Sequence, residues 1–280
     1  MKYSMMFAAT LVALQAIAQD LPKPSPLGEV EQIVGLTEVE FKYSRPSAKE
    51  RKVYGELVPF GELWRTGANQ CTVMEIDGPV VIAGSTVPEG KYCLFTIPNV
   101  DAWTMVLNRN TDLWGTDDYQ QEQDVLRWEV KPSKIPFRET LTISFDAVKE
   151  DKARVDIDWE ETRASFEIFA DASDKAMANI KEAVAKEDAD FRVFNNSARY
   201  CIDKGIMAEQ ALEWATKSVS LEKKFWNVHT LALAHAANGQ YKEAMKTAEE
   251  SMKMAQEADY QPYVKMNKEK MDEWTLKTGR

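Results

Sequence analysis

The sequence contains only two histidines, His229 and His235, and both lie near its C-terminal end. The rest of the chain therefore has no histidine for a Ser-His or Cys-His nucleophilic pair, nor for a histidine-based metal site. A phosphate-binding loop and a dinucleotide fingerprint are also missing. We expect no metal and no cofactor, and an enzyme is the less favoured class. His235 takes a helix-packing position, which favours a core or groove role.

Cysteine is scarce too, with three residues at Cys71, Cys93 and Cys201. Three are too few for a disulfide scaffold. Cys71 and Cys93 fall in predicted strands of one domain, so they form either one bridge or two buried free thiols. Cys201 is left over, in a predicted helix.

Basic residues are outnumbered by acidic ones, and the formal net charge is −10. Lys and Arg number 17 against 27 Asp and Glu over residues 19–170, and 17 against 18 over residues 171–280. A nucleic-acid-binding protein needs a basic face, so this class is excluded. The one basic cluster, Lys42 to Lys52, is local and lies in an acidic setting.

Long apolar runs are missing after the first residues, so we expect no membrane span. Residues 1–18 have the three parts of a signal peptide: Lys2, the apolar stretch Met5 to Leu14, and the cleavage site Ala16-Ile17-Ala18. The alternative is a buried first helix, but nothing caps it. No cysteine follows the cleavage site, so we expect no lipoprotein anchor. The mature protein, starting at Gln19, is expected to be soluble in the periplasm or outside the cell.

Residues 19–170 show the alternation of apolar and polar residues that is typical of β-strands. Residues 19–28 are rich in proline and predict an extended lead-in. Eight or nine short strands then follow, separated by turn residues, and no long amphipathic helix interrupts them. The pattern predicts an antiparallel β-sandwich or jelly roll. These strand signals start at Val39, Thr72, Val80, Tyr92, Trp103, Leu126, Leu141, Val155 and Phe166.

Residues 171–280 are helical in pattern and contain a repeat. The set Phe194, Ser197, Ala198, Cys201 and Gly205 recurs 34 positions later as Val228, Leu231, Ala232, His235 and Gly239. That period is typical of tetratricopeptide repeats, which are helical hairpins. Residues 260–277 are expected to add a capping helix. The whole chain is thus predicted to be α+β, with a β domain followed by a helical array.

A long motif carries a family resemblance. It reads YSRPSAKERKVYGELVPFGELWRTGANQCT at 43–72 and continues with PEGKYCLFTIP at 88–98 and WTMVLN at 103–108. With these motifs, residues 20–170 resemble the domain of unknown function 2911 family, which consists of exported bacterial proteins. The resemblance implies a β fold and an export route, but no reaction.

The stretch Pro59 to Asn69 is the most unusual in the chain, because two glycines and polar groups stand beside a large aromatic residue. Arg65 offers a rigid fork of donors for a carboxylate or phosphate. Trp64 offers a flat apolar face, and Asn69 can both donate and accept hydrogen bonds. These residues predict a site for a small anionic or sugar-like ligand. The alternative is an internal framework in which Trp64 packs over a paired arginine.

Four further residues extend this candidate site. Tyr43, Arg45 and Arg51 join it if their strand pairs with the segment. Trp114 stands beside a glycine in a loop, which makes it a candidate ligand face.

Three functions remain from the sequence. The first is a binding or interaction protein, whose helical repeats hold a protein partner in a groove. The second is a hydrolase of the cell envelope that uses carboxylates near residues 56–69, such as Glu56 and Glu62; Asp117 and Asp118 form a second acidic pair. The third is a purely structural module, in which the repeats form a small bundle and bind nothing.

Overall fold

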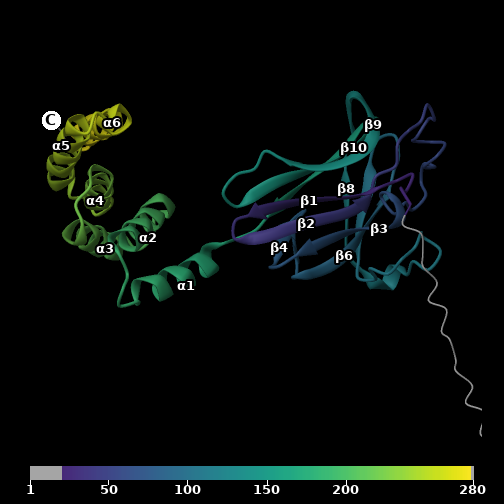
Figure 1. The fold of residues 1–280 in the computed structure, drawn as a ribbon, viewed down its shortest axis with the longest axis horizontal. Coiled ribbons are helices and arrows are strands. Elements are labelled where there is room, and N and C mark those ends of the chain that lie inside the picture. Colours follow the sequence, from purple (N-terminus) through teal and green to yellow (C-terminus); the bar gives the residue numbers. More distant parts are fainter. Residues whose placement is uncertain (1–20, 279–280) are drawn as a thin grey trace, which may run out of the picture. The chain divides into compact units, whose positions relative to one another are not determined.

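The computed structural model describes residues 21–278, and the chain divides into two compact units, Met1–Ala172 and Ser173–Arg280 (Figure 1). The first is called the β unit and the second the helical unit. The predicted signal peptide, residues 1–18, lies outside the described residues.

The β unit contains two antiparallel sheets. Six strands form the first sheet in the order β1-β2-β3-β6-β7-β8, and four form the second in the order β5-β4-β10-β9. The sheets are open, not closed into a barrel. The strands are β1 Leu27–Val34, β2 Thr37–Ser44, β3 Ala68–Ile76, β4 Val80–Ile82, β5 Ser85–Val87, β6 Gly90–Ile97, β7 Trp103–Asn108, β8 Asp124–Val130, β9 Ser133–Asp146 and β10 Lys152–Phe169, with a 3-10 turn at Gln121–Gln123.

One apolar core lies between the two sheets. Phe41 and Met105 come from the first sheet, Ile157 and Trp159 from the second, and all four are almost completely buried. Alternate residues of a strand point to opposite faces, so the predicted alternation places these side chains in one core. The predicted α+β architecture is confirmed.

Strand β1 was not predicted. It pairs with β2 along its whole length, from Leu27 opposite Ser44 to Val34 opposite Thr37. It is an edge strand in which only Val34 is buried. Half-buried and exposed residues alternate along it, and such a strand lacks the apolar period by which core strands are detected.

Element β10 contains two predicted strands, those at Val155 and Phe166. Its ends meet, because the Ala170 amide donates to the Asp151 carbonyl at 2.9 Å. Across the middle, the Ser165 hydroxyl donates to Asp156 at 2.7 Å. Glu160, between the two halves, has a positive φ of 55°. The two halves of β10 therefore face one another, as the arms of a hairpin do.

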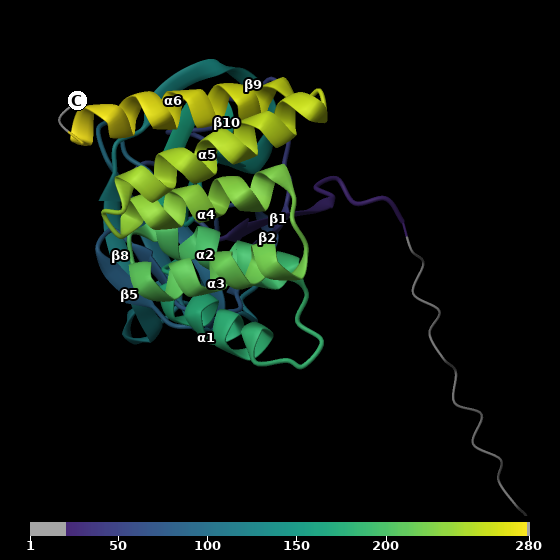
Figure 2. The same cartoon turned by 90° about the vertical axis from the view of Figure 1, so that its left-hand side faces the viewer.

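The helical unit contains six helices among its described residues. They are α1 Ser173–Val184, α2 Phe191–Lys204, α3 Ala208–Leu221, α4 Phe225–Ala237, α5 Tyr241–Glu257 and α6 Gln261–Lys277. Short turns join them, and α2 to α6 pack against their neighbours in chain order (Figure 2). The expected helical array and its final helix are confirmed.

Hydrogen bonds repeat with the 34-residue period. Gly205 follows the last residue of α2, and Gly239 lies in the turn after α4. Both have left-handed φ angles, of 66° and 72°. The next amide in each turn, Ile206 or Gln240, donates to a carbonyl one helical turn back at 2.9 Å. Glycine reaches this conformation without a Cβ clash, so the repeated glycine specifies the repeated turn.

A buried polar ladder ties the helices of successive hairpins together. The Ser218 hydroxyl donates to the Phe191 carbonyl at 2.7 Å and accepts from Asn227 at 3.0 Å. One repeat later, Ser251 donates to the Phe225 carbonyl at 2.7 Å and accepts from an Asn267 amide at 2.9 Å. Every buried polar group in this ladder is thereby satisfied.

None of the helices within residues 21–278 combines the length and apolar character needed to cross a membrane.

Candidate functional site

The segment between β2 and β3, residues 45–67, leaves the first sheet and returns to it. The register between the two strands shifts after Lys42, so that Ser44 lies opposite Ala68. Within the segment, Trp64 and Thr96 exchange two backbone hydrogen bonds of 2.7 and 2.9 Å. This bridge fixes the segment over the end of β6.

The Trp64 side chain points into the core and is only 9% exposed. Its indole ring stacks on that of Trp159, with centroids 5.8 Å apart, and meets the edge of Tyr54. Its Nε1 donates to the Gly67 carbonyl at 3.1 Å. With its ring packed and its indole N–H occupied, Trp64 is part of the core of the β unit.

The residues after Trp64 make a strained turn that needs their particular types. Thr66 and Asn69 have positive φ angles of 54° and 60°. A Cβ on Gly67 would approach the Ser44 carbonyl to 3.0 Å and the Thr72 hydroxyl to 3.1 Å, so any larger residue would crowd both groups. Asn69 tolerates its conformation and donates to the Ser44 hydroxyl at 3.1 Å. These contacts give Gly67 and Asn69 of the Thr-Gly-Ala-Asn motif a role in folding.

Tyr43, Arg45 and Arg51 also hold the framework. The Tyr43 hydroxyl bridges the backbone of Ile143, accepting from its amide at 2.8 Å. Arg45 donates to the Leu141 carbonyl at 3.0 Å, and Arg51 to the Ala48 carbonyl at 2.9 Å. Tyr43, Arg45 and Asn69 thus lie together beside β2. Ligand binding by these residues stays a prediction.

Arg65 and Trp114 differ from the other candidates, because their side chains have no such role. The Arg65 guanidinium is half-buried and forms no ion pair with any residue in the described part of the chain, and its Nε is buried without an acceptor. Trp114 is 69% exposed. The Arg65 carbonyl accepts from the Thr72 amide at 3.2 Å, and the Leu113 carbonyl from the Cys71 amide at 3.0 Å. Both segments are therefore attached to the start of β3.

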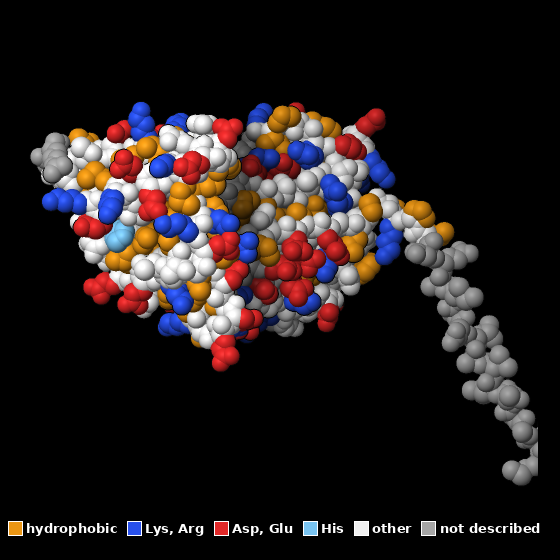
Figure 3. Space-filling view, turned by 60° about the vertical axis from the view of Figure 1, so that its left-hand side comes forward, with side chains coloured by type: hydrophobic (Ala, Val, Ile, Leu, Met, Phe, Trp, Pro, Cys, Tyr) orange, Lys and Arg blue, Asp and Glu red, His pale blue; other side chains and the backbone are white. Residues whose placement is uncertain are grey.

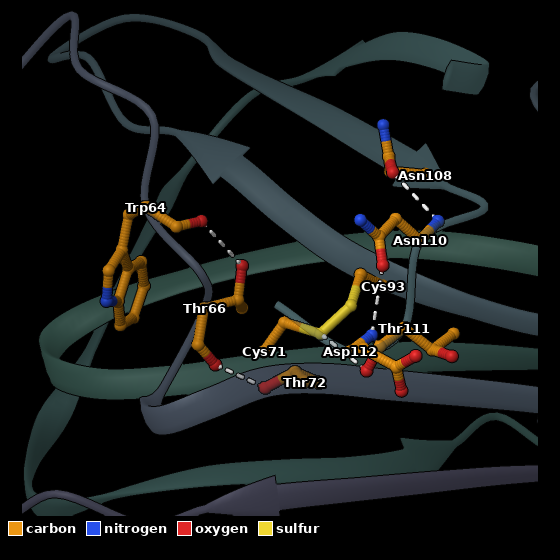
Figure 4. Close-up of a disulfide and its surroundings, with 9 residues drawn as sticks. All are labelled: Trp64, Thr66, Cys71, Thr72, Cys93, Asn108, Asn110, Thr111 and Asp112. Carbon is orange, nitrogen blue, oxygen red and sulfur yellow. Dashed lines mark hydrogen bonds between the residues drawn. A yellow bond between two sulfur atoms is a disulfide. The ribbon is translucent and has the colours of Figure 1, made fainter. Parts of the chain in front are cut away.

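The predicted pair Cys71 and Cys93 forms a disulfide that joins β3 to β6 (Figure 4). The close-up shows the bridge beside the 108–112 loop, where the Cys71 sulfur lies 3.7 Å from the Thr111 carbonyl. The bridge belongs to a second small core with Phe95, Val106 and Leu113. Cys201 is a free, buried cysteine of α2, as expected.

The predicted acidic residues lie on the surface. Glu56 and Lys52 are 3.8 Å apart, with both side chains largely exposed, and Glu62 is also exposed. Asp117 and Asp118 are exposed as well. Over residues 21–278, no group of three or more His, Cys, Asp or Glu side chains could hold a metal ion. Hydrolysis by these carboxylates stays a prediction.

Sequence reasoning missed an ionic network on β10. Asp156 and Asp158 are each only 1% exposed. Arg163 donates to both oxygens of Asp158 at 2.6 Å, and Arg154 and Ser165 each donate to Asp156 at 2.7 Å. In a sequence, alternating charges on a strand indicate a face exposed to solvent. Asp156 and Asp158 are buried against Arg154 and Arg163 because β10 folds back on itself.

A larger group of carboxylates gathers on the β unit in Figure 3. Glu31, burial, Asp77, Glu40 and Glu75 together raise the pKa of Glu38 above its ordinary value. Repulsion among these groups of β1, β2 and β3 makes this face unfavourable for anions.

In the helical unit, helices α2, α4 and α6 pack in sequence and share one face. His229 of α4 is buried, and its Nδ1 lies 2.8 Å from the Asn267 oxygen of α6. The Tyr263 ring stands edge-on to His229 at 5.3 Å. Burial first of all, and then the positive charges of Arg199 and Lys270, lower the pKa of His229.

Asn195 of α2 occupies the position one repeat before His229 and is 8% exposed. Its Nδ2 lies 3.3 Å from the Asn196 oxygen, but its own Oδ1 is buried without a donor. One helical turn later, Arg199 pairs with Asp203 at 2.9 Å. The face of α2, α4 and α6 thus combines an unsatisfied acceptor, two cations and an aromatic ring, and is called the α2–α4–α6 face.

Comparison with known proteins agrees with the resemblance. The model of the family described as "Protein of unknown function (DUF2911)" matches residues 25–168, more than half of the chain and nearly all of the β unit. No curated protein and no solved structure matches the chain. The chain belongs to the DUF2911 family of proteins of unknown function.

Proposed function

We propose that this protein is an exported binding protein that holds an extended acidic segment of a partner protein on the α2–α4–α6 face. The N-terminal signal pattern and the Cys71–Cys93 disulfide support export, because disulfides persist in oxidising compartments. The 34-residue period and its repeated turns support tetratricopeptide-like hairpins, a fold whose stacked helices present a groove to other proteins.

The unsatisfied Oδ1 of Asn195 is the observation that carries the proposal. A buried acceptor without a donor is costly, and few native polar groups remain so. The equivalent position one repeat later, His229, has its partner in Asn267 of α6. A backbone N–H of a bound peptide is a donor of the right kind for Asn195.

The positive charges on the α2–α4–α6 face favour an acidic peptide. Within residues 21–278, Arg199 and Lys270 each pair with a surface carboxylate of their own helix, Asp203 and Glu273, at 2.9 Å. Exposed pairs of this kind contribute little stability, so a peptide carboxylate can replace the partner at small cost. Tyr263 and the neighbouring aromatic Phe225, 5.1 Å away, offer an apolar surface beside the cations.

Fluorescence anisotropy with short, labelled acidic peptides tests the proposal on the mature chain. The double variant Arg199→Ala, Lys270→Ala should bind at least about tenfold more weakly, and so should Asn195→Ala. The matched control removes two exposed lysines from α3 and α5, with Lys217→Ala and Lys253→Ala, and should bind as the parent does. Equal weakening in the control would show a nonspecific charge effect and contradict the proposal.

A second candidate function rests on Arg65, whose guanidinium has no ion pair within residues 21–278. An anion at Arg65 would supply the missing acceptor. Native mass spectrometry of the mature chain from its envelope fraction should then show an extra mass that Arg65→Ala loses. The control Lys49→Ala removes an exposed cation from the same 45–67 segment and should keep it.

A further inference from the structure

A cavity of about 380 Å³ opens in the β unit. Strand β8 contributes Trp128 and Glu129 to its wall, and β10 contributes Lys152, Phe166 and Glu167. The volume falls within the range of small-molecule sites, about 300–1,000 Å³. None of the residues in the sequence-predicted site lines it.

The cavity exists because the sheets are open. Strand β8 is the last strand of the first sheet, and it lies against β10 and β5 of the second. Strand β4 pairs with β10 only at Ile168 and Phe169 and then turns at Ala83-Gly84. Phe166 and Glu167 therefore have no β4 partner, and a seam remains between the two sheet edges.

Trp128, one of the lining residues, has an indole N–H without an acceptor. Trp128 is only 8% exposed, and its Nε1 is buried with no hydrogen-bond partner. The Phe166 ring meets the Trp128 ring edge-on at 5.2 Å, which fixes the indole. Native proteins rarely leave such a donor unsatisfied, so a bound molecule with an acceptor oxygen fits this wall.

The three charged side chains that line the cavity, Glu129, Lys152 and Glu167, form no ion pairs with one another. The Lys152 ammonium lies 5.7 Å from the centre of the Phe169 ring and forms no ion pair in the described part of the chain. Glu129 and Glu167 line the same cavity and are exposed. The wall thus offers donors at Trp128 and Lys152, acceptors at the two glutamates, and aromatic faces.

We propose that this seam cavity binds a neutral sugar. An anion would be repelled by the two glutamates, and a cation would leave the donors of Trp128 and Lys152 without an acceptor. A neutral sugar avoids both penalties, because each hydroxyl can accept from Trp128 or Lys152 and donate to Glu129 or Glu167. Its apolar ring face packs on the aromatic side chains. The site is separate from the α2–α4–α6 face and does not depend on it.

NMR on the mature chain tests the proposal, with the Trp128 indole N–H signal as the reporter. The probes are glucose, galactose, mannose and N-acetylglucosamine, each also as a disaccharide, at millimolar concentration. At least one sugar should shift the Trp128 signal in a saturable way. In Trp128→Phe, which removes the donor, part of the buried ring and this reporter signal, binding is followed on the signals of the sugar itself and should be about tenfold weaker. Chemical denaturation measures the stability of the variant alongside, because the substitution shortens a buried side chain.

Charge variants complete the test. Lys152→Gln and Glu167→Gln should each weaken sugar binding, whereas the exposed residues Lys134 and Glu161, changed to Gln, should leave it unchanged. If no sugar moves the Trp128 signal, the proposal is wrong. If phenylacetate, an aryl carboxylate, moves it and binds more tightly than every sugar, the cavity is an anion site and the proposal is also wrong.

Discussion

The indole rings of Trp64 and Trp159 stack with their centroids 5.8 Å apart and an angle of 21° between their planes. Trp64 comes from the irregular segment between two strands, and Trp159 from the middle of β10. The stack therefore fastens that segment to the second sheet. The segment with the most unusual sequence in the chain therefore contributes a side chain, Trp64, to the core of the β unit.

Replacing Trp64 tests this role. Trp64→Ala should lower the free energy of unfolding by about 3–5 kcal/mol, because it leaves a large cavity beside Trp159. Chemical denaturation followed by near-UV circular dichroism measures the change. Trp114→Ala, at an exposed tryptophan, should change stability by less than about 0.5 kcal/mol. Comparable losses in both variants would contradict the difference in their burial.

Breaking the Cys71–Cys93 bridge should also destabilise the β unit. The two cysteines are 22 residues apart, and closing a loop of that length contributes about 3 kcal/mol in the chain-entropy account. Adding reductant should therefore bring the parent protein to the stability of Cys71→Ala, Cys93→Ala. The double variant itself should not respond to reductant, and Cys201→Ala should respond as the parent does. An unchanged parent in reductant would show that the bridge contributes nothing.

The sequence predicted those parts of the fold that follow from local periodicity. Phe41 and Ile157 alternate with polar neighbours in strands that face a core. Gly205 and Gly239 stand 34 residues apart, and each supplies the left-handed residue of its turn. At these positions the sequence pattern follows directly from the geometry of the strand or the turn that the residues form.

Features that depend on distant pairing could not be predicted. Asp158 and Arg163 are five residues apart, and they meet only because β10 folds back on itself. The seam cavity depends on where β4 stops pairing with β10, which no pattern within Val80–Ile82 indicates. Trp64 was a ligand candidate because glycines surround it, but glycine permits a turn that buries a side chain equally well.

Acid should weaken the β unit through Asp156. Burial opposes its charged form, but hydrogen bonds from Arg154 and Ser165 and the charge of Arg163 outweigh burial and lower the pKa of Asp156 below 3.8. The folded protein then binds this proton less readily than the unfolded chain. The contribution is present above about pH 4 and is lost as the pH falls below that value.

Denaturation between pH 7 and pH 3 measures this loss. Asp156→Asn should be less stable than the parent at pH 7, by about 1–3 kcal/mol, because Arg154 and Ser165 lose hydrogen bonds to a buried charged acceptor. Its stability should then fall less steeply below pH 4. Asp101→Asn, at an exposed aspartate, should follow the parent curve. Parallel curves for the parent and Asp156→Asn would assign the acid loss to other groups.

The helical unit should lose stability at a higher pH, through His229. Burial and then the nearby Arg199 and Lys270 lower the pKa of His229 below 6.5, although its hydrogen bond to Asn267 acts in the opposite direction. The unfolded chain therefore binds the proton more readily. Stability is complete above about pH 6.5 and declines as the pH falls through and below that value.

The variant His229→Gln separates this effect from general acid denaturation. Glutamine does not titrate and can still bond to Asn267, so the variant should lose less stability between pH 7 and pH 5 than the parent does. Hydrogen exchange of the α4 and α6 amides reads the helical unit alone. His235→Gln is the matched control, because the half-buried His235 bonds to Gln240 near the surface. If His235→Gln flattened the pH dependence and His229→Gln did not, the buried contact with Asn267 would not be the titrating one.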